Sequence, residues 1–275
     1  MSTTAERRRI FRRRHEGGCF ALPNPWDIGS AKYLEYLGFK AIATTSAGFA
    51  FSRGLPDGGV GRDLMLAHIR EMVKATDLPV NADFENGYAH DPDEVAQNVQ
   101  RCVETGVAGL SIEDNSGRGD EPLYELEFAA ERVRAARSAI GDRGVMLTGR
   151  AECFLVGVND IDDVIRRLTA YAEAGADCLY APGIRERDHV AAVVKAVAPK
   201  PVNLLISAPS SLTVREAADL GVRRVSVGGA LARAAWGGFI RAAKELAEAG
   251  TFEGFGGATP HREVQQFFKR VTSDM

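Results

Sequence analysis

Four acidic residues follow consecutive β-rich segments of the chain, and together they could hold a cation: Asp57, Asp83, Glu113 and Glu152. If these segments are neighbouring parallel strands, the carboxylates converge at one edge of the sheet. Two carboxylates about 4 Å apart repel by about 4 kcal/mol at an effective dielectric constant near 20. Arg150 could offset only one of these charges. Because hard cations take carboxylate and water oxygens, the cluster predicts a Mg²⁺ or Mn²⁺ site.

The positions of the histidines argue against two other common kinds of site. None of them lies at the end of a predicted strand: His15, His68, His90, His189 and His261. We therefore expect neither a His-ligated zinc site nor a Ser–His–Asp triad. His90 is the only one that could approach the site, and we interpret it as an exposed loop residue.

Other polar residues at strand ends have two interpretations. Thr45 and Ser46 could bind a ligand, but Ser and Thr at such positions often cap the following helix. Trp26 could line a pocket or pack in the core. A single acidic residue at a strand end is more often a helix cap or a surface ion pair, whereas four at successive strand ends favour a site.

Eight short β-rich segments alternate with amphipathic helical segments, and this alternation predicts a parallel sheet. We predict strands at 19–22, 41–44, 79–82, 109–112, 145–148, 178–181, 201–204 and 225–228. We predict the intervening and following helices at 28–37, 62–76, 92–105, 125–140, 160–174, 186–197, 213–220 and 229–249. Eight units in 275 residues fit a (β/α)8 TIM-type barrel.

The main structural alternative is an open doubly wound sheet. Its dinucleotide-binding fingerprint would place a glycine-rich turn after the first strand. That turn instead reads Pro23-Asn24-Pro25-Trp26-Asp27. We therefore prefer the barrel.

The chain shows no linker long enough to divide it, so we predict one barrel domain over residues 1–275. Residues 251–275 form a tail with an extra C-terminal helix near 260–271. Its apolar residues are Val264, Phe267, Phe268 and Val271. This helix could cap the base of the barrel or reach a neighbouring subunit, which suggests a homo-oligomer, either a dimer or a tetramer.

Composition excludes several classes of partner. The formal net charge is −3, so no nucleic-acid footprint is expected. There is no apolar run of about 18 residues to span a membrane. The N-terminal arginines are interpreted as a short solvated helix rather than a binding arm: Arg7, Arg8, Arg9, Arg12, Arg13 and Arg14.

Scattered cysteines without a CxxC pair favour a reducing, cytoplasmic location.

Six segments resemble the isocitrate lyase/phosphoenolpyruvate mutase superfamily in order and spacing. They are NPWDIGSA (24–31), TSAGFAFSRGLPD (45–57), ADFENGY (82–88), IED (112–114), GRAE (149–152) and PVN (201–203). The resemblance covers nearly the whole chain. It implies a (β/α)8 barrel that binds Mg²⁺ and small 2-oxo carboxylates or their enolates.

For the substrate, the resemblance implies that backbone amides around Thr45, Ser46 and Ala47 hold a carboxylate. Trp26 lies in one of the shared segments, and we include it among the substrate-binding candidates. Asn203 would meet a distal carboxylate.

For the metal, the resemblance implies that Asp57, Asp83 and Glu113 surround the ion, largely through water. Arg150 would neutralise the charge that develops on an enolate. Arg150, Glu113 and Asp57 are therefore the catalytic candidates, and Glu152 would support them.

The chain also departs from the superfamily pattern at three places. Isocitrate-type lyases carry a catalytic Cys loop where residues 115–122 read NSGRGDEP. Phosphoryl-transferring members carry a His where residues 180–183 read YAPG. Asn81 occupies a position where many members have a carboxylate that ligates the metal directly.

The leading functional hypothesis is therefore a Mg²⁺-dependent lyase or decarboxylase acting on a 2-oxo or 2-hydroxy di- or tricarboxylate. One alternative is carbon–phosphorus chemistry on phosphonopyruvate, and another is non-catalytic binding of 2-oxo acids. Glu113, Asp120 or Tyr124 could supply a proton if the loop at 115–122 closes over the site.

Overall fold

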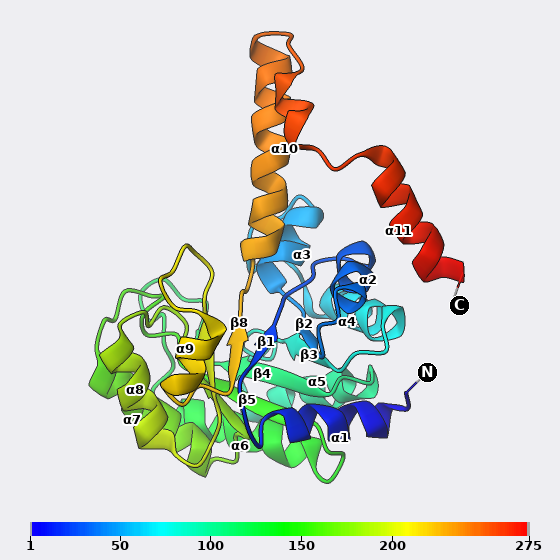
Figure 1. Cartoon of the computed structure of the whole chain (residues 1–275). Helices are drawn as coiled ribbons and strands as arrows, with labels where there is room; N and C mark the ends of the chain where they lie inside the picture. Colours follow the sequence, from blue (N-terminus) through cyan, green and yellow to red (C-terminus); the bar gives the residue numbers. More distant parts are fainter. Residues whose placement is uncertain (1, 274–275) are drawn as a thin grey trace.

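The computed structural model describes residues 2–273, and eight parallel strands in them form a nearly closed barrel (Figure 1). The strands are β1 (Phe20–Leu22), β2 (Ile42–Ala43), β3 (Val80–Asp83), β4 (Gly109–Glu113), β5 (Met146–Arg150), β6 (Cys178–Tyr180), β7 (Val202–Leu205) and β8 (Arg224–Ser226). Each pairs with its neighbour in sequence from β2 to β8, and β8 pairs with β1. Between β1 and β2, the Ala43 N–H donates to the Pro23 carbonyl at 3.0 Å. The predicted TIM-type barrel is confirmed.

The helices surround the strands at the predicted places. They are α1 (Thr4–Arg14), α2 (Ile28–Tyr36), α3 (Ser46–Ser52), α4 (Arg62–Ala75), α5 (Pro92–Glu104), α6 (Leu126–Ile140), α7 (Ile161–Glu173), α8 (Arg187–Val197), α9 (Val214–Asp219), α10 (Ala230–Glu248), the 3₁₀ helix η1 (Glu253–Gly257) and α11 (His261–Ser273). The short α3 was not predicted. Thr45 caps it, because its hydroxyl accepts from the Gly48 N–H at 3.3 Å.

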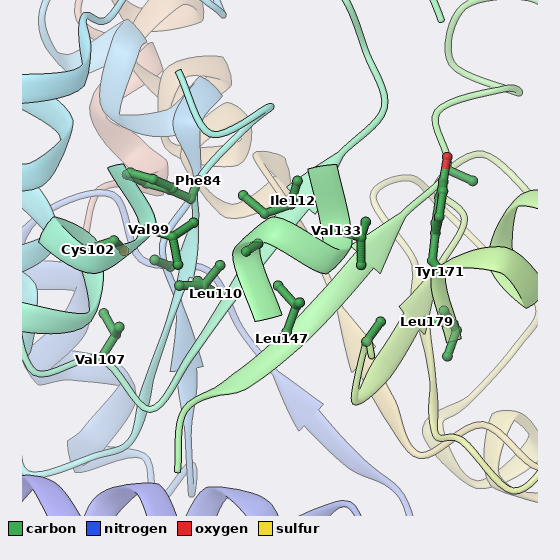
Figure 2. Packing of buried hydrophobic residues seen from close by; sticks show 14 of the residues in the cluster. Phe84, Val99, Cys102, Val107, Leu110, Ile112, Val133, Leu147, Tyr171 and Leu179 are labelled. Carbon is green, nitrogen blue, oxygen red and sulfur yellow. The ribbon is translucent and has the colours of Figure 1, made fainter. Parts of the chain in front are cut away.

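Alternation along the strands separates the core from the site. On β4, Leu110 and Ile112 are buried in the apolar cluster between the strands and the outer helices (Figure 2). The alternate residues of the strand, Ser111 and Glu113, therefore face the barrel interior. The same alternation places Leu147 of β5 in the core. A barrel interior is usually filled by branched apolar residues, so its polar residues here mark the site.

Helix α1 closes the end of the barrel opposite α3 (Figure 1). Phe11 is fully buried, and the guanidinium groups of Arg7 and Arg8 donate to the carbonyls of Val73 and Val107, each at 2.9 Å. The prediction of a helix was right, but its description as merely solvated was wrong. Two of its arginines cap carbonyl groups at the base of the barrel.

Helix α10 extends away from the barrel (Figure 1), and among its residues only Ala232 is buried. Helix α11 returns to α2, where the ring of Phe267 lies 5.0 Å from that of Tyr33 and 5.4 Å from that of Tyr36. The tail helix therefore packs beside the barrel rather than capping its base.

Within residues 2–273, no helix combines the length and the apolar character needed to cross a membrane.

Candidate active site

A cavity of about 320 Å³ lies at the carboxyl ends of the strands. Its walls contain most of the predicted site residues: Thr45, Ser46, Ala47, Asp57, Asp83, Arg150 and Asn203. Glu113 stands behind Arg150 rather than in the wall. The structure thus brings together segments that are far apart in the sequence, because parallel strands end at one face of a barrel.

Arg150 is the centre of the acidic cluster. Its Nη1 lies 3.1 Å from Oε2 of Glu113 and 3.3 Å from Oδ1 of Asp83, and its Nε donates to Glu152. The ring of Tyr180 supports the guanidinium, with Cζ 5.2 Å from the ring centroid. Burial acts to lower the pKa of Arg150, but the charges of Glu113 and Glu152 raise it well above its usual value. Arg150 is therefore a fixed cation.

The site nevertheless holds more carboxylates than the single positive charge of Arg150 can neutralise. Burial, opposed by Arg150 and reinforced by neighbouring carboxylates, raises the pKa of Glu113 well above its usual value. Asp57 lies on an exposed loop, and its pKa is raised by partial burial and by the charge of Asp83. Burial is the largest cause of both shifts and the neighbouring carboxylates add to it, so a cation placed in the cavity would favour the ionised forms of both groups.

The residues present fit a hydrated hard cation better than a directly caged one. In the described part of the chain, no three acidic, His or Cys side chains are already spaced to hold a metal ion. Asp57 and Asp83 present carboxylate oxygens to the cavity, and Mg²⁺ is commonly held by one or two carboxylates and several waters. These two residues would hold the ion, with water completing its shell, and Glu113 would act on it only through water.

Ser46, a predicted substrate-binding residue, contacts two of the predicted metal ligands. Its N–H donates to Oδ2 of Asp83 at 2.9 Å, and its hydroxyl donates to Oδ1 of Asp57 at 3.2 Å. The Asp83 N–H in turn donates to the Thr44 hydroxyl at 2.9 Å. Asp83 is thereby held in one position at the start of α3.

Trp26 was predicted to contact substrate, but the structure places it outside the walls of the cavity. A Cβ on Gly48 would lie 3.0 Å from Trp26 Cβ and 2.7 Å from Thr45 Cγ2. Trp26 therefore packs against the first turn of α3, and Gly48 is required for this close approach. Packing was the other interpretation of this residue.

Asn203 is buried on β7 and lines the cavity. Its Oδ1 accepts from Nε of Arg224 at 2.8 Å, and its Nδ2 donates to the Ser226 hydroxyl at 2.9 Å. The orientation of the amide is therefore fixed by two neighbours on β8.

Sequence reasoning missed a buried network behind Arg150. The Asp114 carboxylate accepts from the Glu152 N–H at 2.8 Å, from Nη1 of Arg167 at 3.1 Å and from the hydroxyl of Tyr171. These bonds fix the turn that carries Glu152. A signal was present, because Arg167 and Tyr171 lie four residues apart on the otherwise apolar face of α7.

The predicted proton donors of the loop are not in the cavity wall. Tyr124 is buried and its hydroxyl contacts Nδ1 of His90, while Asp120 is exposed. Glu85, which was not predicted, has a left-handed conformation with φ of 46°, and its carbonyl accepts from the Glu113 N–H at 3.0 Å. Burial raises its pKa to about 7, although the hydroxyl of Tyr88 donates to it at 2.8 Å.

Comparison with known proteins gives one consistent result. A family model described as phosphoenolpyruvate phosphomutase matches residues 11–247. The chain is 30% identical to the oxaloacetate decarboxylase of Paraburkholderia xenovorans (strain LB400) over 237 residues, which cover 82% of this chain and 76% of that relative. A candidate lyase/mutase from Burkholderia cenocepacia J2315 is 48% identical, with a TM-score of 0.93 and 97% of both chains covered. Oxaloacetate acetylhydrolase bound to its product oxalate is 27% identical, with a TM-score of 0.84 over 99% of this chain and 98% of that one.

Proposed function

The chain belongs to the phosphoenolpyruvate phosphomutase family of the isocitrate lyase/phosphoenolpyruvate mutase superfamily, and on this premise we propose that it is a Mg²⁺- or Mn²⁺-dependent carbon–carbon lyase or decarboxylase. Its substrate would be a small 2-oxo or 2-hydroxy di- or tricarboxylate. The observation that carries the proposal is the position of Arg150, which lines the cavity among Asp83, Glu113 and Glu152.

This arrangement suits cleavage of a bond next to a 2-oxo group, which leaves its electron pair on an enolate. The N–H groups around Ser46 and Ala47 would bind the carboxylate of the substrate. Arg150 would donate hydrogen bonds to the enolate oxygen where negative charge develops, and such preorganised donors are typically worth a factor of about 10²–10³ in rate. The bound cation would supply further electrophilic stabilisation of the same oxygen.

Two features narrow the choice among the reactions of the superfamily. The loop at 115–122 has neither Cys nor His, which counts against isocitrate-type cleavage. The segment 180–183 contains no His for phosphoryl transfer, which counts against carbon–phosphorus chemistry. The relative named oxaloacetate decarboxylase supports the choice.

We also propose that the protein is a homo-oligomer in the cytoplasm. Helix α10 leaves Trp236, Phe239 and Ile240 exposed in its middle, and the following η1 leaves Phe255 exposed. Apolar side chains gathered in this way are typical of interaction surfaces. The four cysteines are free, as a reducing compartment would keep them.

The test is a substrate panel with Mg²⁺ that contains oxaloacetate, substituted malates and phosphonopyruvate. We expect a 2-oxo acid or other cleavage product from at least one carboxylate substrate, and no phosphate release from phosphonopyruvate. Phosphate release without carbon–carbon cleavage would favour the phosphonopyruvate alternative. Binding of 2-oxo acids without any product would favour the non-catalytic alternative.

A further inference from the structure

Arg224 is a buried cation in the barrel interior. It begins β8, is 2% exposed, and lies in register with Asn203 of β7 and Phe20 of β1. Its side chain lines the same cavity as Arg150, together with Asn81, Asn203 and Ser226. Arg224 therefore faces the space in which we place the substrate.

In the described part of the chain, Arg224 forms hydrogen bonds with four side chains, and all four are uncharged. Nε donates to Asn203 Oδ1 at 2.8 Å and Nη2 donates to Thr148 Oγ1 at 3.1 Å. Nη1 lies 3.4 Å from both Asn81 Oδ1 and His15 Nε2, at the outer limit of a hydrogen bond. Within residues 2–273, no carboxylate forms an ion pair with this guanidinium.

His15 does not neutralise Arg224 either. The Nδ1 atom of His15 lies 2.8 Å from the Phe11 carbonyl, so Nδ1 carries the proton and Nε2 faces Arg224 as an acceptor. Burial and the charge of Arg224 lower the pKa of His15 to about 3. The ring is therefore neutral near pH 7.

A buried charge without a counter-charge is costly unless an ion of opposite sign can reach it. Here the cavity extends to Arg224, whereas the acidic cluster around Arg150 occupies the ends of β3, β4 and β5. The site thus combines an acidic side, suited to a cation, with a deeper positive charge that is suited to an anionic group of the ligand.

Because Asn81 is a neutral amide, it leaves the positive charge of Arg224 free to pair with an anionic ligand. An aspartate there would place a carboxylate beside Nη1 of Arg224 and pair with it. The neutral amide only accepts a long hydrogen bond. Gly109 provides the room, because a Cβ at that position would lie 2.6 Å from Asn81 Oδ1.

We propose that Arg224 binds the second carboxylate of a small dicarboxylate and so sets the preference for dicarboxylates over monocarboxylates. This assignment rests on the proposed function, since it assumes that the first carboxylate and the 2-oxo or 2-hydroxy group lie near Ser46 and Arg150. Asn203, which itself donates to the Ser226 hydroxyl, then positions the guanidinium, and both residues border the same subsite.

The experiment is calorimetric titration of the full chain with Mg²⁺, using two matched pairs of probes and oxalate. The pairs are 2-oxoglutarate with 2-oxovalerate, and malate with 2-hydroxybutyrate. We expect the wild type to prefer the dicarboxylate of at least one pair. Arg224→Met should reduce that preference by about 10- to 100-fold, as the loss of a charged hydrogen bond predicts. Its affinity for oxalate, which has no distal carboxylate, should not change.

Two further variants separate charge from structure. Asn81→Asp leaves Arg224 in place but neutralises it, and should also reduce the preference. Thr148→Val removes one hydrogen bond of Arg224 but leaves its charge, and should retain the preference.

The outcomes distinguish the two proposals. If oxalate binds but the wild type shows no dicarboxylate preference, or if Arg224→Met keeps the preference, the assignment of Arg224 is wrong and the proposed function is unaffected. If the wild type binds neither oxalate nor any 2-oxo or 2-hydroxy acid, both are wrong.

Discussion

The backbone N–H of Ser46 donates to Oδ2 of Asp83 at 2.9 Å, which joins a predicted substrate-binding amide to a predicted metal ligand. One N–H makes one strong hydrogen bond at a time. A substrate carboxylate can therefore use this amide only when Asp83 releases it, and a cation that attracts Asp83 would favour the release. Metal and substrate binding should be coupled through this pair.

We expect Mg²⁺ and oxalate together to raise the melting temperature by more than the sum of their separate effects. The stabilisation by each ligand follows RT ln(1 + [L]/Kd), so coupling appears as a lower Kd for oxalate when Mg²⁺ is present. Thermal denaturation with each ligand alone and with both measures it. Equal stabilisation by oxalate with Mg²⁺ and with a chelator would show that the two sites are independent.

Asp114 should contribute strongly to stability. Asp114→Ala would remove the acceptor for Tyr171 and for the Glu152 N–H, and would leave Arg167 with Asp163 as its remaining carboxylate partner. We expect a loss of about 2–4 kcal/mol in the free energy of unfolding, measured in urea.

The matched control is Tyr171→Phe, which removes one hydroxyl from the Asp114 network and keeps the ring. It should cost about 1–2 kcal/mol. A cost for Asp114→Ala no larger than that of the control would mean that the network does not hold the turn after β5.

His15 should make the protein less stable in acid. Its folded pKa of about 3 lies below the ordinary value of 6.5, so the unfolded chain binds the proton more readily. The contribution of the neutral His15 ring to the free energy of unfolding is fully present above about pH 6.5. It is lost as the pH falls toward 3, by at most about 1.4 kcal/mol per pH unit. His15→Gln should therefore lose less stability than the wild type between pH 6.5 and 4.5. Parallel stability curves for the two proteins would contradict the neutral, buried ring.

The apolar surface of α10 should hold subunits together. Phe239 is 61% exposed, and Phe239→Glu should shift the protein toward smaller species in light scattering after size-exclusion chromatography. Leu37→Glu is the control, because Leu37 is 54% exposed but belongs to the C-terminal end of α2 and not to α10. A wild type that is monomeric at all concentrations would rule out the proposed homo-oligomer.

The sequence predicted the elements well where local chemistry decides them. The eight strands and their helices lie within a few residues of the predicted ranges, because short β-rich segments and amphipathic helical periodicity are local signals. Asp83, Glu113 and Arg150 could be brought together from sequence, since each ends a strand and strand ends share one face of a barrel.

Other features depend on contacts that no local pattern reveals. Arg224 stands beside Arg223 just after a helix-ending glycine, as a surface arginine would, yet it enters the barrel. The amphipathic pattern of α10 predicts a helix, but it does not identify the surface against which the apolar face of that helix packs. Trp26 was ambiguous for the same reason, because its packing partner is the first turn of the unpredicted α3.

The most direct test of the central claim compares wild type and Arg150→Ala on the carboxylate panel, each with Mg²⁺ and with a chelator. We expect Mg²⁺-dependent release of a 2-oxo acid or other cleavage product by the wild type. We also expect kcat/KM for Arg150→Ala to be at least about 100-fold lower, as the loss of a donor to the enolate oxygen predicts. No turnover of any member by a wild type that demonstrably binds Mg²⁺ and oxalate, or full activity of Arg150→Ala, would contradict an enolate-stabilising site built around Arg150.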